Sequence, residues 1–287
     1  MRILEFLAFG LGAIALSSSG EARTAKPADQ PSTVPFEFYK SHIYVSAFVD
    51  GKGPYRFIVD TGASGTGRAD QRLVAELSLR PVGHEQNSDG INSAPILLVS
   101  ADSLRLGNLE KHHVTLASRD YNLQLKPGEA PVMGIIGREF FKNRLLTIDY
   151  PARTIRFTNG RLRPGDAGVV AYKTDLTIPV CFALGCFDGR VDSGSDGSLM
   201  VPKSLASRIP ATAPVAADSA TAANTHFKLW EEQLLQPVRI SGVTATNQKI
   251  LYSDPSDELI NIGSDFLKDY VLTIDQRHHL LRISRGN

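Results

Sequence analysis

Two aspartates occur in the same local setting at two places in the chain. Asp60 lies in the segment FIVDTGAS at 57–64, and Asp192 lies in the segment GRVDSGSD at 189–196. In both segments the aspartate follows an apolar residue at the end of an expected strand and precedes Thr-Gly or Ser-Gly. A charge at the end of a buried strand costs free energy unless other groups satisfy it. We therefore take both aspartates as candidate catalytic groups.

The residues that follow the aspartates suit tight loops that face each other. Gly62 and Gly194 allow the backbone to turn sharply and to bring N–H groups close. The hydroxyls of Thr61 and Ser193 are able to form hydrogen bonds with the opposite loop. If the loops meet, the two carboxyls share one site, so that one of them keeps a proton. One carboxyl then serves as a base toward a water molecule and the other as an acid.

The two motifs belong to a longer internal repeat. Residues 136–149 read IGREFFKNRLLTID and residues 262–275 read IGSDFLKDYVLTID, which are identical at eight of fourteen positions. The order of strand, aspartate motif, helix-like stretch, variable region, Ile-Gly, strand and hairpin therefore occurs twice. This order predicts an ancient duplication that produced two similar lobes. A pseudo-twofold axis between the lobes would bring the two aspartates together.

The local pattern predicts an all-β fold with few short helices. Short runs of β-branched and aromatic residues, separated by turn residues, are typical of strands. We expect strands at 42–49, 55–59, 145–150, 155–158, 271–275 and 280–284, and short helices at 70–79 and 202–209. Residues 159–168 suit a linker between the lobes. The stretch 211–225 is rich in Ala, Ser and Thr and suits a mobile surface loop.

The chain resembles the two-lobed, pepsin-like aspartic proteases, with bacterial retropepsin-like character in each lobe. The two aspartate segments resemble the hydrophobic–Asp–Thr/Ser–Gly motifs of that family. GIIG at 134–137 and INIG at 260–263 resemble the family's second element, which packs under the catalytic loop. The resemblance covers roughly residues 36–286. It implies an N-terminal lobe at 36–162 and a C-terminal lobe at 163–287.

The resemblance also implies a mechanism. Asp60 and Asp192 become the catalytic pair, which acts on a water molecule with no covalent intermediate and no metal or other cofactor. The supporting residues are those that brace or turn the two loops, namely Thr61, Gly62, Ser193 and Gly194. Substrates of the family lie extended between the lobes, so that a peptide or an unfolded protein segment is the expected partner. With both aspartates in one chain, a monomer suffices for the chemistry.

Two features depart from the family pattern. The family often has a second hydroxyl that supports the catalytic carboxylate, and Ser64 fits this role, whereas Asp196 occupies the matching place in the second lobe. A third carboxylate near the pair would raise the pKa values there, unless Asp196 turns outward into solvent, which we favour. The candidate flap is a hairpin at about 82–97 with its turn at Ser88, Asp89 and Gly90, and it carries no aromatic residue.

The N-terminus has the pattern of a secretory signal. A basic start, a short apolar run and small residues around Ser17, Ser19 and Ala22 predict a signal peptide at 1–22. The alternative is a buried N-terminal helix. The apolar run is too short to span a bilayer, so we expect a periplasmic or secreted protein with no stable membrane insertion. Residues 23–35 suit a flexible leader.

The chain has two cysteines, Cys181 and Cys186, in the segment CFALGC. Four intervening residues that include Gly185 suit a hairpin turn, which would place the cysteines opposite each other. In an exported protein such a pair is able to oxidise to a disulfide. The alternative is that both are small buried hydrophobic residues.

Composition excludes several classes of protein. The 287 residues are 42% hydrophobic, and 31 basic against 30 acidic residues give a net charge of +1. Such a chain is too apolar to be disordered throughout, and it lacks the basic excess typical of nucleic-acid binding. The leading hypothesis is an aspartic endopeptidase. The alternatives are a non-catalytic peptide- or protein-binding module on the same fold, and an enzyme for a narrow processing or non-protein substrate.

Overall fold

The computed structural model describes most of the chain. The described residues are 32–88, 92–123, 125–217, 220–221, 226–254 and 258–286. The expected signal peptide and most of the expected leader lie outside them, as do Asp89 and Gly90 of the expected flap turn. None of the helices in the described part combines the length and the apolar character that crossing a bilayer requires.

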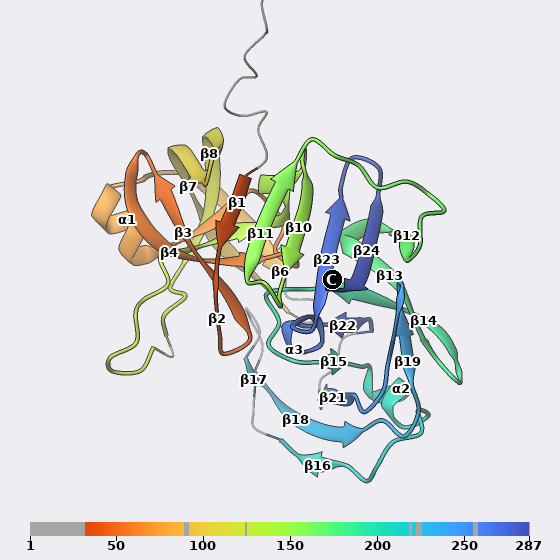
Figure 1. The fold of residues 1–287 in the computed structure, drawn as a ribbon. Helices are drawn as coiled ribbons and strands as arrows, with labels where there is room; N and C mark the ends of the chain where they lie inside the picture. Colours follow the sequence, from red (N-terminus) through yellow and green to blue (C-terminus); the bar gives the residue numbers. More distant parts are fainter. Residues whose placement is uncertain are drawn as a thin grey trace, which may run out of the picture.

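The fold is all-β, as the sequence predicts, and its strands form three sheets (Figure 1). An eight-stranded sheet is built entirely from the N-terminal half of the chain and lies on the left of Figure 1. In spatial order its strands are β2 Glu37–Tyr39, β3 His42–Val49, β4 Lys52–Asp60, β9 Gly134–Gly137, β5 Gly67–Asp70, β8 Leu109–Arg119, β7 Ser93–Leu106 and β6 Arg80–Ser88.

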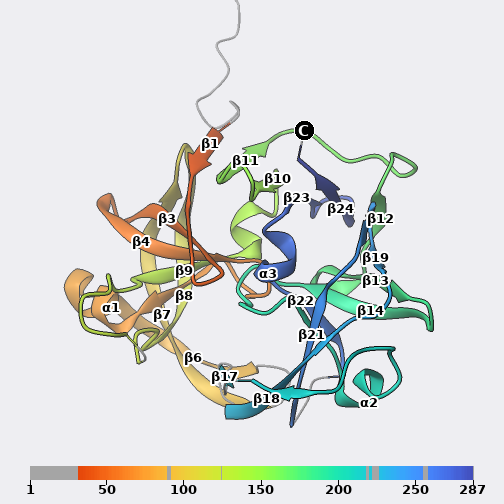
Figure 2. The same ribbon diagram turned by 60° about the horizontal axis from the view of Figure 1, so that its bottom comes forward.

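A ten-stranded sheet is built entirely from the C-terminal half of the chain. In spatial order its strands are β16 Val215–Ala216, β18 His226–Gln233, β21 Lys249–Asp254, β15 Leu199–Met200, β22 Ile260–Ile262, β14 Gly185–Val191, β13 Thr177–Phe182, β19 Val238–Ile240 and β20 Val243–Ala245, with β17 Ala220–Thr221 paired to β18. The two larger sheets lie on either side of the molecule, as a second view shows (Figure 2).

A six-stranded antiparallel sheet joins the two halves. In spatial order its strands are β1 Ser32–Pro35, β11 Thr154–Thr158, β10 Leu145–Asp149, β23 Tyr270–Asp275, β24 Leu280–Arg285 and β12 Val169–Ala171. Where the halves meet, Thr147 of β10 pairs with Thr273 of β23. Thr273 is the counterpart of Thr147 in the internal repeat, 126 residues further on. A strand from each half therefore pairs with its own counterpart, which supports the expected pseudo-twofold relation and duplication; both stay predictions.

The helices are few and short. They are α1 Gln71–Leu77, α2 Lys203–Ala206 and α3 Ser264–Leu267, together with 3-10 turns at Arg138–Phe141 and Thr174–Leu176. The predicted helix at 70–79 is α1, and the one predicted at 202–209 shortens to α2. Asp70 caps α1 because its carboxylate accepts the N–H of Arg72 at 2.9 Å. Ser78 ends the helix in the left-handed conformation, with φ of 53°.

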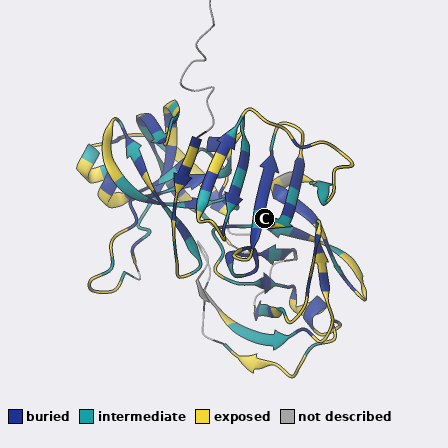
Figure 3. Cartoon of the chain, viewed as in Figure 1, coloured by how far each residue is buried: buried dark blue, intermediate teal, exposed yellow. Residues whose placement is uncertain are grey.

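The strand pattern places one face of each strand in the core. In β3, Ile43, Val45, Ala47 and Val49 are buried, and the residues between them are partly or fully exposed. The same alternation is visible along many strands in Figure 3. Burial of apolar side chains from all three sheets provides the main stabilisation of the fold.

The predicted C-terminal boundary of the flexible leader, residue 35, is wrong. Residues 32–35 were expected to be flexible, but they form β1, which pairs with β11 in the joint sheet. The reason is that Val34 alternates inward and is only 8% exposed, although the segment is proline-flanked and weakly apolar. The expected mobile loop at 211–225 is also corrected in part, because β16 and β17 within it pair with β18.

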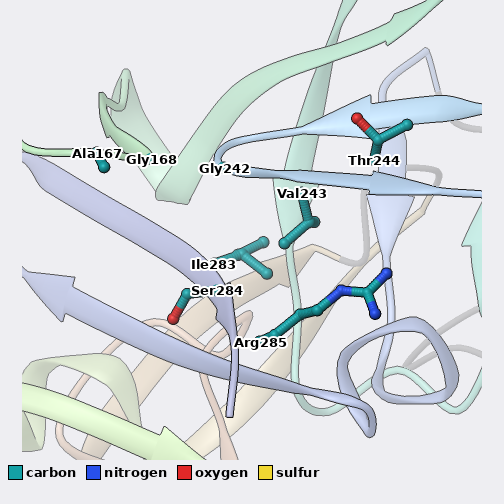
Figure 4. Close-up of a pocket in the computed structure, with 8 residues that line it drawn as sticks. All are labelled: Ala167, Gly168, Gly242, Val243, Thr244, Ile283, Ser284 and Arg285. Carbon is teal, nitrogen blue, oxygen red and sulfur yellow. The ribbon is translucent and has the colours of Figure 1, made fainter. Parts of the chain in front are cut away.

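A hollow lies where the joint sheet meets the β19–β20 hairpin (Figure 4). Gly168 and Gly242 bring two backbones into close contact there, since a Cβ added to Gly168 would lie 2.9 Å from the Cα of Gly242. The hydroxyl of Ser241 donates to the carbonyl oxygen of Gly168 and accepts the N–H of Ile283. The hollow has no lining residue from either aspartate loop, and we assign it to packing.

Substitutions in β1 test its place in the fold. We expect Val34→Asp to lower the free energy of unfolding by about 2 kcal/mol or more, because an unpaired carboxylate would enter the core. Thr33→Asp on the exposed face of the same strand is the control, with an expected effect within about 0.5 kcal/mol. Urea unfolding of both variants measures the difference. Equal effects would mean that β1 is not docked.

Candidate active site

Each aspartate lies at the end of a strand that has a parallel partner. Asp60 is the last residue of β4, which pairs with β9, and Asp192 directly follows β14, which pairs with β22. The two pairings have the same register in the two halves. The corresponding pairs are Val59–Ile136 and Val191–Ile262. The repeat in the sequence is therefore also a repeat in the geometry that positions the carboxylates.

The glycine of each Ile-Gly element lies against an aspartate loop. A Cβ added to Gly137 would lie 2.4 Å from the carbonyl oxygen of Gly65, and one added to Gly263 would lie 2.2 Å from that of Gly197. Real Cβ atoms do not approach backbone so closely. Each Ile-Gly element therefore fits under its loop only because it carries a glycine.

The two loops bind each other through reciprocal hydrogen bonds. The N–H of Thr61 donates to Oγ of Ser193 at 3.0 Å, and the N–H of Ser193 donates to Oγ1 of Thr61 at 3.0 Å. The hydroxyl of Thr61 in turn donates to the carbonyl oxygen of Val191, and that of Ser193 to the carbonyl oxygen of Val59. Thr61 is 1% exposed and Ser193 is not exposed at all. These bonds fix the relative position of the two aspartates.

The two carboxyls lie side by side, each against the opposite loop. A Cβ added to Gly62 would lie 2.4 Å from the carboxyl of Asp192. A Cβ added to Gly194 would lie 2.2 Å from the carboxyl of Asp60. The glycines of both motifs therefore leave the space that the opposite carboxyl occupies. Both aspartates remain partly exposed, so that water reaches them.

The shared site raises the pKa of Asp60 to about 7. Burial of the carboxyl is the largest cause, and the adjacent charge of Asp192 adds to it. The N–H of Ala63, which donates to Oδ1 of Asp60 at 2.8 Å, and the cation of Arg68 act in the opposite direction. Asp60 is thus the member of the pair that holds a proton below neutral pH.

Asp192 has hydrogen bonds that suit a carboxylate. Its Oδ1 accepts the N–H of Gly194 at 2.9 Å, and its Oδ2 accepts Nδ2 of Asn261 at 3.1 Å. Asn261 lies on β22, and its counterpart in the first half is Ile135 of β9, which has no polar group to offer. The two carboxyls therefore have unlike surroundings. Sequence reasoning missed Asn261, although the pair GIIG and INIG contains this one polar difference.

The residue after each Ile-Gly element also supports an aspartate loop. Ser264 donates to the carbonyl oxygen of Ser193 at 3.0 Å, and the guanidinium of Arg138 donates to that of Gly62 at 3.0 Å. The hydroxyl of Tyr150 lies 3.2 Å from that of Ser264. Arg138 and Ser264 occupy matching positions of the repeat. Both side chains therefore hold an aspartate loop by a hydrogen bond to its backbone, one through a guanidinium and the other through a hydroxyl.

Two residues singled out from the sequence lie away from the pair. Ser64 is exposed, and the expectation that its hydroxyl supports Asp60 is wrong, because the N–H of Ala63 makes that contact instead. The loop turns so that the backbone N–H of Ala63 faces the carboxyl of Asp60. Asp196 is exposed as well, in agreement with the outward orientation that we favoured.

The expected flap hairpin is present as strands β6 and β7. They pair antiparallel up to Ser88 and Ser93. Ser88 is exposed, while Asp89 and Gly90 lie outside the described residues. A role of this turn in covering a substrate stays a prediction.

Cys181 and Cys186 form a disulfide between β13 and β14. They face each other across the hairpin, and Cys186 is exposed, so that the two are not buried hydrophobic residues. The same strand β14 leads into Asp192. The disulfide therefore closes the outer end of the hairpin whose inner end carries a catalytic candidate.

A double-mutant cycle on Thr61 and Ser193 tests the link between the loops. We expect Thr61→Val and Ser193→Ala each to cost about 1–3 kcal/mol of folding free energy, because each leaves a buried N–H without an acceptor. The double variant should cost less than the sum, because the loss of either bond lets the two loops separate and weakens the other bond. Ser64→Ala, in the same loop but exposed, is the control. A cost of Ser193→Ala no larger than that of Ser64→Ala would contradict the structure.

Comparison with known proteins shows a similarity in the N-terminal half of the chain. The chain has no match among curated proteins. The family model described as aspartyl protease matches residues 45–140. That stretch contains Asp60 with its loop and the Ile-Gly element at 136–137, whereas Asp192 lies beyond it. Over residues 45–140, the chain is therefore similar to the aspartyl protease family.

Proposed function

We propose that the protein is an aspartic endopeptidase in which Asp60 and Asp192 act together on one water molecule. The observation that supports this most directly is the position of each carboxyl against the glycine of the opposite loop. Two carboxyls placed so closely share a proton. The match of residues 45–140 to the aspartyl protease family model agrees with the proposal.

Unlike surroundings assign different roles to the two carboxyls. Asp192, which accepts N–H groups from Gly194 and Asn261, is the base. It removes a proton from water as the water oxygen bonds to the carbonyl carbon of the substrate. Asp60, whose pKa is raised to about 7, donates its proton to the carbonyl oxygen. The product of this step is a neutral tetrahedral diol.

The second step restores both carboxyls. Asp192 passes its proton to the amide nitrogen, and one hydroxyl of the diol returns a proton to Asp60. The C–N bond then breaks, which releases an amine and a carboxylic acid. The proposal requires neither a covalent intermediate nor a further cofactor.

The same proposal includes a substrate class and a location. A peptide or an unfolded protein segment is the substrate, since a scissile amide must reach the pair in an extended form. The location is periplasmic or secreted. The apolar N-terminal run and the disulfide between Cys181 and Cys186 support this location, because disulfides persist in oxidising compartments.

Cleavage of a diverse peptide pool tests the proposal. The chain from residue 23 should cleave peptides between pH 3 and 7. Asp60→Asn and Asp192→Asn should each reduce kcat/KM by at least about 1,000-fold, because each removes a group of the acid–base pair. Asp196→Asn, an exposed carboxylate four residues after Asp192, is the matched control and should stay active.

The outcomes separate the proposal from its rivals. Full activity in either variant of the pair would refute the catalytic roles. A protein that is folded by circular dichroism, yet cleaves nothing at any pH, would favour a non-catalytic binding module. Cleavage of a single processing site would favour a narrow substrate range.

The pKa of Asp60 predicts the basic limb of the pH profile. Asp60 must hold its proton to act as the acid, and its pKa is about 7. We therefore expect kcat/KM to be high below pH 7 and to fall as the pH rises through about 7. Initial rates on one good peptide from pH 3 to 9 measure this. A rate that stays constant to pH 9 would contradict the assigned role.

A further inference from the structure

One arginine beside the catalytic pair has a buried side-chain nitrogen without a hydrogen-bond partner. Arg68 lies on β5, where it pairs with Ile135 of β9 and Ala117 of β8. Its side chain points away from the core, since the neighbouring Gly67 faces Leu104 there. Nε of Arg68 is buried with no hydrogen-bond partner, and among the described residues the guanidinium makes no ion pair with a carboxylate.

A buried tyrosine hydroxyl lies beside this arginine. The hydroxyl of Tyr121 is buried, and the guanidinium of Arg68 acts on it as a hydrogen-bond donor. Burial raises the pKa of Tyr121, and the nearby guanidinium of Arg68 lowers it. The backbone of Tyr121 is well fixed, because its N–H donates to Oδ2 of Asp70 at 2.8 Å. Asp70 is fully buried and also binds Asn122 and the start of α1.

Both groups lie within electrostatic reach of the catalytic pair. Arg68 lowers the pKa of Asp60, and the charge of Asp60 raises that of Tyr121. The strand order agrees, since Ile135 of β9 pairs with Arg68 on one side and with Ile58, two residues before Asp60, on the other. Arg68 and Tyr121 are therefore close enough to the pair for their charge and dipole to act on a substrate held there.

The fold itself does not require a cation at this place. The counterpart of Arg68 in the second half is Met200, which has the equivalent pairing to β21 and β22. A half-buried guanidinium without a carboxylate partner costs desolvation free energy. Charge-assisted, forked hydrogen bonds to a carboxylate would recover that cost, and a tyrosine hydroxyl would add a third donor.

We propose that Arg68 and Tyr121 form a subsite that binds a carboxylate of the substrate next to the scissile bond. The carboxylate belongs either to an acidic side chain or to the C-terminus of the peptide. The inference rests on the proposed peptidase function and specifies its substrate class.

Matched peptides test the subsite. Peptides that differ only by Glu or Gln at one position beside the cleaved bond are compared, each with a free or an amidated C-terminus. We expect the wild type to prefer the carboxylate peptide by roughly tenfold or more in kcat/KM, mainly through KM. Glu against Gln reports on a side-chain carboxylate, and free acid against amide reports on the C-terminus.

Variants assign this preference to the two residues. Arg68→Met, which introduces the residue found at position 200, should abolish the preference, and Tyr121→Phe should weaken it. The control is Arg72→Met, which replaces an exposed arginine on α1. This variant should keep the preference for the carboxylate peptide. If Arg68→Met shifts the pH profile and leaves the preference intact, Arg68 only tunes Asp60 and the inference fails.

A binding measurement separates this inference from the proposed activity. Calorimetry with the Asp192→Asn variant, with and without Arg68→Met, compares the affinities for the same peptides. A carboxylate preference that depends on Arg68 supports the subsite even if the wild type cleaves nothing. Equal affinities for the carboxylate and amide forms at every position would overturn the inference, whether or not the protein is a peptidase.

Discussion

The reciprocal hydrogen bonds between Thr61 and Ser193 are the interaction on which the rest of the site depends. Each hydroxyl accepts the N–H of the other loop and donates to a carbonyl beyond it, so that all four groups are satisfied out of contact with water. Because the loops are tied at this point, two like charges are forced into one site. The raised pKa of Asp60 is a direct result. The packing of the three sheets serves to bring these two short segments together.

The repeat in the sequence predicts the symmetric part of the site, and it fails for the parts that depend on orientation or distant contacts. The strand-end positions of Asp60 and Asp192 and the loops that follow them could be predicted, because the motif, its spacing and the order of elements occur twice in the sequence. Ser64 was misplaced, since spacing along a loop does not tell which groups turn inward. β1 was missed because its partner β11 lies more than 100 residues away and a short polar segment gives no periodic signal. Asn261 and Tyr121 were missed for the same reason: their importance comes from neighbours that are remote in the chain.

Where the two halves differ, they differ at matching positions. Ile135 corresponds to Asn261, Arg138 to Ser264 and Arg68 to Met200, while the strand registers around them are unchanged. The backbone thus supplies two equivalent frames, and a few substitutions within them make the carboxyls unequal. Such inequality is what acid–base catalysis by two identical groups requires.

The pairing of Thr147 with Thr273 has a consequence for how the site persists in solution. Pairing of a strand with its own counterpart, as between β10 and β23, is the arrangement found at the interface of a symmetric homodimer. In a true dimer, dilution would separate the partners and the shared site would vanish with them. Here one continuous chain connects the two sides, which keeps their effective concentration high, on the order of millimolar for short flexible connections. The paired carboxyls therefore remain assembled however dilute the protein becomes.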